Sequence, residues 1–226
     1  MINIDSLFKK NIHKISDSKW YYLVNSSKLG VKRNISGLVG LLSAEEQQKY
    51  IRLRIPQDRR SFLCARLILR NEFKNHYNIS FDEPINFNNF GKPVLLKRPD
   101  INFNITHCND YVAVGFSELP IGVDLENVVN YDKKQILELS RIVYHSSEVN
   151  LLNQSSLAKA QYLFTKLWSI KESIIKAMGK GFYIDTKTFV INDILSDSPY
   201  LSENIFDNFT ILNYMINDEM TISISH

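Results

Sequence analysis

The chain is poor in the features that mark secreted and membrane proteins. Among its 226 residues only two are cysteines, Cys64 and Cys108, which is too few for a disulfide framework and fits a reducing cytoplasm. No apolar run reaches the roughly 18 residues that a membrane span requires. The first residues lack a basic segment followed by an apolar one, so we expect no signal peptide. These absences predict a cytoplasmic protein without a membrane partner.

An excess of charge of either sign is also missing. The chain has 27 Lys and Arg residues against 24 Asp and Glu residues, a formal net charge of +3. This balance does not indicate general nucleic-acid binding, but it allows local basic patches that bind phosphates or an acidic partner. The hydrophobic fraction of 44% and the charged fraction of 23% are typical of a globular protein. The length suffices for one large domain or two small ones.

Residue periodicity predicts helices and strands in alternating groups. Apolar residues at steps of three and four predict helices, the first of them opened by a capping box at Ser43. β-branched and aromatic residues in alternation predict strands. Residues 1–18 show no firm pattern, and residues 25–40 and 145–156 have the polar composition of loops. The expected helices cover residues 43–55, 58–77, 132–144 and 157–178, and the expected strands cover residues 20–24, 101–106, 111–116, 121–126, 189–191, 209–216 and 219–225.

A helix pair followed by strands occurs twice along the chain, before and after about residue 119. This order predicts an α+β protein of two related halves, residues 1–119 and residues 120–226. No sequence identity between the halves is visible, so the expectation depends on the order of elements alone.

The stretch from Ile121 to Glu126 predicts a short strand with two carboxylates on one face. Strand side chains alternate between faces, so Asp124 and Glu126 lie opposite the apolar side chains. Two carboxylates this close repel each other unless a cation lies between them, and Mg²⁺ prefers carboxylate oxygens together with water and substrate phosphates. An ordinary edge strand with a wet acidic face is the other explanation.

The expected helix 157–178 carries one aromatic and two charged side chains at helical spacing. Trp168, Glu172 and Lys176 are four residues apart and share one face. Glu172 and Lys176 form either a routine surface ion pair or part of a site.

The expected helix 58–77 carries Arg66, Arg70 and Lys74, also four residues apart. They form either a solvated basic face or a contact for phosphate or an acidic partner, because the arginine fork fits phosphate oxygens.

Three segments together resemble the 4′-phosphopantetheinyl transferase superfamily in its Sfp-type branch. Residues 103–107 resemble its F-N-[IV]-[ST]-H block, and residues 121–126 resemble [IV]-G-[IV]-D-[IVL]-E. Residues 168–181 match every fixed position of W-x-x-K-E-[SA]-x-x-K-x-x-G-x-G, and Gly91-Lys92-Pro93 agrees with a G-K-P element that precedes the first block. The resemblance spans roughly residues 42–192.

The resemblance implies two similar halves related by pseudo-twofold symmetry, with coenzyme A in the cleft between them, in a chain that is monomeric. It implies Mg²⁺-dependent transfer of 4′-phosphopantetheine from coenzyme A to a serine of an acyl or peptidyl carrier protein, with Mn²⁺ as an alternative metal. The by-product is adenosine 3′,5′-bisphosphate. The carrier is an acidic helical domain of fatty-acid, polyketide or nonribosomal peptide biosynthesis.

The resemblance also assigns roles to single residues. Asp124, Glu126 and Glu172 fall on the metal ligands, and Lys176 falls one turn beyond Glu172, within reach of a phosphate or the leaving group. His107 falls on the histidine that contacts a coenzyme A phosphate. For the proton of the attacking serine we expect Glu172, or a metal-bound water, as the acceptor. The further expected contacts to coenzyme A are Arg60, Lys92, Pro93, Thr106 and Lys176.

The chain departs from the family pattern at three positions. Cys108 stands where serine is usual, and Thr106 replaces a serine but keeps the hydroxyl. Ser61 stands at a position where arginine is frequent in the run that meets the 3′-phosphate. The assignment of that phosphate to Arg60 is therefore a choice among neighbouring arginines.

Two other functions compete with the transferase. A Mg²⁺-dependent hydrolase of nucleotide-linked pyrophosphates uses similar carboxylates, although the denser Glu-rich helix of such enzymes is absent here. A non-catalytic module that binds acidic helical carriers through Arg66, Arg70 and Lys74 leaves the spaced carboxylates unexplained.

Overall fold

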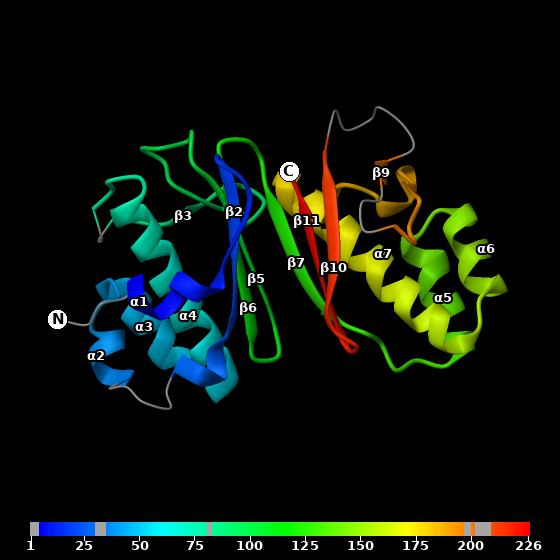
Figure 1. Cartoon of the computed structure of the whole chain (residues 1–226), viewed down its shortest axis with the longest axis horizontal. Helices are drawn as coiled ribbons and strands as arrows, with labels where there is room; N and C mark the ends of the chain where they lie inside the picture. The colour runs from blue at the N-terminus through cyan, green and yellow to red at the C-terminus, as the bar shows by residue number, and fades with distance from the viewer. Residues whose placement is uncertain (1–4, 30–34, 81–82, 197–199, 202–208) are drawn as a thin grey trace. The chain divides into compact units, whose positions relative to one another are not determined.

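The chain folds into two compact units (Figure 1). The computed structural model describes residues 5–29, 35–80, 83–196, 200–201 and 209–226. Unit 1 comprises Met1–Phe87 and Pro93–Glu118, and unit 2 comprises Asn88–Lys92 and Leu119–His226. None of the described helices is long and apolar enough to cross a membrane. The elements confirm a mixed α/β chain, whereas a pseudo-twofold relation of the halves and a cleft between them stay predictions.

Unit 1 is built on an antiparallel sheet with the strand order β1-β2-β6-β5. All of β1 lies where the sequence shows no firm pattern, and α2 lies in the expected loop 25–40. The strands are β1 (Ile12–Ser16), β2 (Lys19–Asn25), β5 (Asn102–Cys108) and β6 (Tyr111–Ser117), with the short pair β3 (Asn86–Phe87) and β4 (Pro93–Val94); the helices are α1 (Asp5–Phe8), α2 (Ile35–Val39), α3 (Ala44–Arg52) and α4 (Pro56–Asn75).

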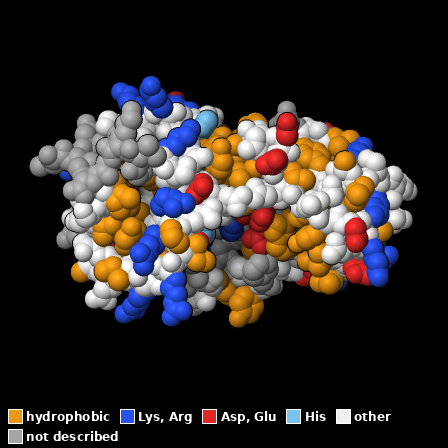
Figure 2. Space-filling view, turned by 90° about the horizontal axis from the view of Figure 1, so that it is seen from below, with side chains coloured by type: hydrophobic (Ala, Val, Ile, Leu, Met, Phe, Trp, Pro, Cys, Tyr) orange, Lys and Arg blue, Asp and Glu red, His pale blue; other side chains and the backbone are white. Residues whose placement is uncertain are grey.

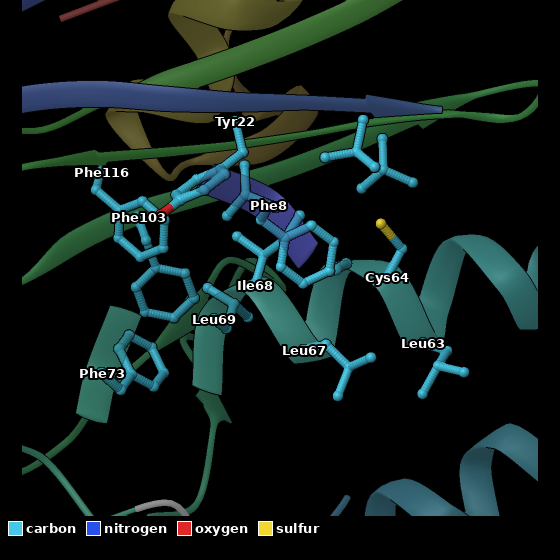
Figure 3. Close-up of a cluster of buried hydrophobic side chains, with 14 of the residues drawn as sticks. Phe8, Tyr22, Leu63, Cys64, Leu67, Ile68, Leu69, Phe73, Phe103 and Phe116 are labelled. Carbon is cyan, nitrogen blue, oxygen red and sulfur yellow. The ribbon is translucent and has the colours of Figure 1, made fainter. Parts of the chain in front are cut away.

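Helix α4 supplies the centre of the unit 1 core. The helix is buried on two sides: Figure 3 shows Cys64 and Ile68 pointing toward the strands of the sheet and Leu67 pointing the other way. Phe73 packs edge-on against Phe103, with 5.3 Å between the ring centroids. The apolar periodicity of residues 58–77 correctly predicted this packed helix.

Of the three basic residues singled out on α4, Lys74 is exposed, but Arg66 and Arg70 contradict both interpretations made from the sequence. Arg66 and Arg70 are buried, and both pair with Oε1 of Glu46 on α3, at 3.4 Å from Arg66 Nε and 2.8 Å from Arg70 Nη2. Oε2 of Glu46 accepts a hydrogen bond from the backbone N–H of Ser43 in the capping box. Arg66 and Arg70 are therefore internal cross-links, neither a solvated face nor a docking surface, and the binding-module alternative loses its basis.

Unit 2 has a three-stranded antiparallel sheet of order β10-β11-β7 and a long helix, α7, that packs on it. Residues 145–156 were expected as loop, but a capping box between His145 and Glu148 opens α6 there, and buried Leu152 anchors it. The strands are β7 (Gly122–Asn127), β8 (Ile191–Asn192), β9 (Tyr200–Leu201), β10 (Ile211–Asn217) and β11 (Met220–Ser225); the helices are α5 (Lys133–Val143), α6 (Ser146–Gln154) and α7 (Leu157–Met178).

Some large hydrophobic side chains stay exposed in both units, for example Ile51 and Leu96 in unit 1 and Ile142 in unit 2. Figure 2 shows exposed hydrophobic side chains interspersed with charged ones on one face of the molecule. Scattered exposure of this kind is normal for globular proteins.

The approach of β7 to α7 depends on Gly122. A β-carbon on residue 122 would lie 1.8 Å from the carbonyl oxygen of Ser173 and 2.5 Å from the backbone nitrogen of Ala177. Both atoms belong to the helix backbone and cannot rotate away as a side chain does. The face of β7 that carries Gly122, Asp124 and Glu126 is therefore the face pressed against α7.

We predict that Gly122→Ala lowers the free energy of unfolding by about 3 kcal/mol or more, since overpacking against backbone atoms forces the strand and the helix apart. Urea unfolding followed by circular dichroism measures this. Gly40→Ala is the control, because its β-carbon comes no closer than 3.5 Å to Gly37 and Ser36. Equal urea midpoints for the two variants would contradict the close packing.

Candidate active site

The acidic face of β7 meets a charged stripe of α7 within unit 2. The side chain of Asp124 is 3% exposed, and its Oδ1 lies 2.5 Å from Nζ of Lys176 on α7. Ser169 on α7 also approaches β7, with its Oγ 3.5 Å from the backbone oxygen of Asp124. The structure thus brings Lys176 and Asp124 together, residues that are 52 positions apart in the sequence.

Glu126 and Glu172 complete a negatively charged cluster with Asp124. The pKa of Glu126 is raised to about 7, first by burial and then by Asp124 and Glu172, against the opposing effects of Lys176 and of a hydrogen bond from Trp168. The pKa of Glu172 is also raised, by burial and then by Asp124 against the opposing Lys176. Because Asp124 raises and Lys176 lowers the pKa of both glutamates, the four side chains share one electrostatic site.

The donor set of this cluster fits a hard divalent cation in its chemistry. Asp124, Glu126 and Glu172 offer only carboxylate oxygens, which Mg²⁺ and Mn²⁺ prefer. Within the described residues no group of three or more His, Cys, Asp or Glu side chains is arranged to hold a metal ion. The Lys176 ammonium supplies a positive charge at Asp124, so a metal that binds there has to compete with Lys176.

The turn Asn88–Lys92 fastens the end of α7 to the start of β7. Nζ of Lys92 donates to the backbone oxygen of Ala177 at 2.9 Å and lies 3.4 Å from that of Ile121. Asn88 donates to the backbone oxygen of Gly179 at 2.8 Å. Burial lowers the pKa of Lys92 to about 8. Lys92, expected as a contact to coenzyme A, thus binds main-chain carbonyls of unit 2.

The other predicted residues lie in unit 1, where His107 is exposed at the end of β5. His107 lines a cavity of about 300 Å³ together with Lys49 of α3 and Ser61 of α4. Thr106 is buried, and strand alternation directs it to the opposite face of β5 from His107. Pro93 begins β4.

Arg60, the arginine chosen for the 3′-phosphate, pairs with Asp110 at 2.9 Å and does not line this cavity. The polar and charged side chains that line the cavity with His107 are instead Lys49, Asp58, Ser61 and Arg66. The sequence singled out Ser61 only as a departure from arginine, and no pattern pointed to Lys49. The register of α3 and α4 against β5 brings them to His107.

Comparison with known proteins agrees with the family that the motifs indicate. The profile described as 4′-phosphopantetheinyl transferase superfamily matches residues 120–220, and the profile of the 4′-phosphopantetheinyl transferase N-terminal region matches residues 30–118. The 4′-phosphopantetheinyl transferase gsp of Aneurinibacillus migulanus is 31% identical over 172 residues, which are 75% of this chain and 70% of gsp. The chain belongs to the 4′-phosphopantetheinyl transferase superfamily.

Two further relatives support the assignment of the chain to this superfamily. The Sfp protein of Bacillus subtilis is 28% identical over 154 residues, which cover 68% of this chain and 67% of Sfp. The L-aminoadipate-semialdehyde dehydrogenase-phosphopantetheinyl transferase of Candida glabrata is 27% identical over 178 residues, 76% of this chain and 67% of that protein. The predicted family and enzyme class are thereby confirmed, whereas the roles of single residues stay predictions.

The raised pKa of Glu126 predicts how the stability of the metal-free transferase depends on pH. Between the ordinary glutamate pKa of 4.5 and the raised pKa of about 7, the folded state binds more protons than the unfolded state. The free energy of unfolding therefore falls as pH rises through this window. Urea unfolding in EDTA from pH 4.5 to pH 7.5 should show this fall, and Glu126→Gln should reduce its slope. An unchanged slope in the variant would contradict the raised pKa.

Proposed function

We propose that this chain transfers the 4′-phosphopantetheine group of coenzyme A to a serine hydroxyl of an acyl or peptidyl carrier protein. The reaction uses Mg²⁺ or Mn²⁺ and releases adenosine 3′,5′-bisphosphate. The observation that carries the proposal is the cluster of Asp124, Glu126, Glu172 and Lys176 between β7 and α7. The family membership and the printed activity of the relatives support it.

The cluster suits the charge that develops when a pyrophosphate linkage breaks. In this proposal Asp124, Glu126 and Glu172 hold the metal ion, which when bound neutralises negative charge on the pyrophosphate. Lys176 then exchanges Asp124 for a phosphate oxygen and stabilises the leaving group. Glu172 takes the proton of the attacking serine, and its raised pKa strengthens it as a base. A metal-bound water is the alternative proton acceptor.

The cavity beside His107 is our proposed site for the 3′-phosphate of coenzyme A. Lys49 and His107 supply positive charge or N–H donors, and Ser61 supplies a hydroxyl that lacks a hydrogen-bond partner in the structure. Arg60 is a weaker candidate because Asp110 already holds its guanidinium. Thr106, Lys92 and Pro93 remain proposed contacts to the rest of coenzyme A, with Lys92 acting from the turn that it fastens.

The same proposal covers the place where coenzyme A binds, the oligomeric state, the cellular location and the carrier. Two related halves provide the cleft for coenzyme A, the chain acts as a monomer in the cytoplasm, and the carrier is an acidic helical domain. Net charge supports an acidic partner only weakly, at +3 for the whole chain.

The direct test incubates the protein with coenzyme A, Mg²⁺ and an apo carrier protein and weighs the carrier by mass spectrometry. We expect a gain of one phosphopantetheine group on the carrier serine, and none with Asp124→Ala. Glu138→Ala, which removes an exposed carboxylate of α5, is the matched control and should keep full activity. Cleavage of coenzyme A without carrier modification would instead support the hydrolase. An active Asp124→Ala variant would remove the basis of the proposal.

The second test compares coenzyme A with 3′-dephospho-coenzyme A. Lys49→Ala and His107→Ala should each raise KM for coenzyme A about tenfold or more, because a charge-assisted hydrogen bond is worth about 1.5–3 kcal/mol. The same variants should leave KM for the dephospho analogue nearly unchanged.

Lys97→Ala is the control for this comparison, since Lys97 is an exposed lysine of unit 1 that pairs with Glu83. Equal losses on both substrates in the His107 and Lys49 variants would place the 3′-phosphate elsewhere.

A further inference from the structure

The residue just before Glu172 is a lysine with no exposed surface. Nζ of Lys171 lies 2.8 Å from Oε2 of Glu148 and donates at 2.7 Å to the backbone oxygens of Thr186 and Phe189. An ammonium has three N–H donors, so these contacts satisfy all of them. Lys171 is therefore neither a surface lysine nor a ligand for phosphate.

Glu148, on α6, is satisfied as completely as Lys171. Its Oε1 accepts from the backbone N–H of Ile191 at 2.9 Å, and its Oε2 accepts from that of His145 at 3.0 Å. The Glu148 side chain is 3% exposed. The pair thus joins the start of α6, the middle of α7 and the segment Thr186–Ile191 at one buried point.

Stability alone is a weak reason for such a pair. Burying two charges costs desolvation energy, and replacement of a buried ion pair by apolar residues of similar size is often neutral or stabilising. Unlike an apolar contact, the hydrogen-bonded ion pair is directional. It sets the distances from α7 to two backbone carbonyls and to α6. It therefore fixes the rotation and the height of α7 at the position next to Glu172.

The helix is held from a second side by β7. Lys176 and Ser169 bind groups of Asp124 there, and Gly122 allows the close approach. Glu172 lies between these contacts in the sequence, and Lys171 adjoins it. A small rotation of α7 moves the Glu172 carboxylate relative to Asp124 and Glu126.

We propose that Lys171 and Glu148 are positioning residues that hold Glu172 in place for metal binding and proton transfer. The inference rests on the proposed function, because it assigns the pair to the same site. Neither residue touches the substrates; both act through the helix that carries Glu172.

The test replaces the ion pair by an apolar pair of similar size. Lys171→Met leaves Glu148 as an uncompensated buried charge and should destabilise the fold. The double variant Lys171→Met, Glu148→Met should recover the urea midpoint. We expect it to keep a kcat about tenfold or more below wild type and a Mn²⁺ affinity weakened about tenfold, by electron paramagnetic resonance, as for loss of a supporting contact to a metal ligand. KM for coenzyme A should change little.

Lys166→Met is the matched control. Lys166 is also buried on α7, and its Nζ donates to the backbone oxygen of Ser196 at 2.8 Å. This variant loses a similar contact one to two turns before Glu172, so it should lose stability but keep kcat and Mn²⁺ affinity. If the double variant does not fold, Glu148→Gln, which preserves the shape of the side chain, takes its place in the test. We expect it to lower kcat.

A double variant with wild-type kcat and Mn²⁺ affinity would overturn the inference, and so would an equal loss of both in Lys166→Met. These outcomes differ from failure of the proposed function, in which the wild-type chain itself transfers no phosphopantetheine to any carrier.

Discussion

Gly122 lacks a side chain, and the backbone of β7 therefore lies directly against the backbone of α7. The other features of the candidate site depend on this contact. Strand alternation then places Asp124 and Glu126 on the face toward the helix, and helical spacing places Trp168, Glu172 and Lys176 on the facing stripe. Alternate residues of β7 and every fourth residue of α7 meet at one site because no β-carbon at residue 122 separates the two backbones.

The resulting cluster is costly for the folded state, which is consistent with a functional role. Burial and the nearby Asp124 raise the pKa of Glu126 and Glu172, so their charged forms are disfavoured without a further cation. Lys176 offsets part of this cost through Asp124. The site thus attracts a cation, and a bound cation would in turn attract a phosphate ester. Perturbed carboxylates of this kind are common at catalytic sites.

The sequence alone predicts the structure correctly where the signal lies within one segment of the chain. Period-two and period-four patterns located β7 and α7, and the resemblance of three segments to known motifs indicated the family. The sequence does not predict the environment of a residue whose partner lies on another element of the fold. Arg66 and Arg70 appeared to be a surface stripe because their partner, Glu46, lies on another helix. The helix α6 was missed because polar residues dominate it, although its N-cap His145 and buried Glu148 bind within the fold. The cavity of Lys49, Ser61 and His107 depends on tertiary packing that no single segment encodes.

The central claim is that the acidic face of β7 holds a divalent cation against the pyrophosphate of coenzyme A. The most direct measurement is ³¹P relaxation of coenzyme A bound to the protein, with Mn²⁺ in place of Mg²⁺. We predict one Mn²⁺ per chain and strongly enhanced relaxation of both pyrophosphate phosphorus nuclei, with a smaller effect on the 3′-phosphate. Absence of Mn²⁺ binding, or an equal effect on all three phosphorus nuclei, would contradict it.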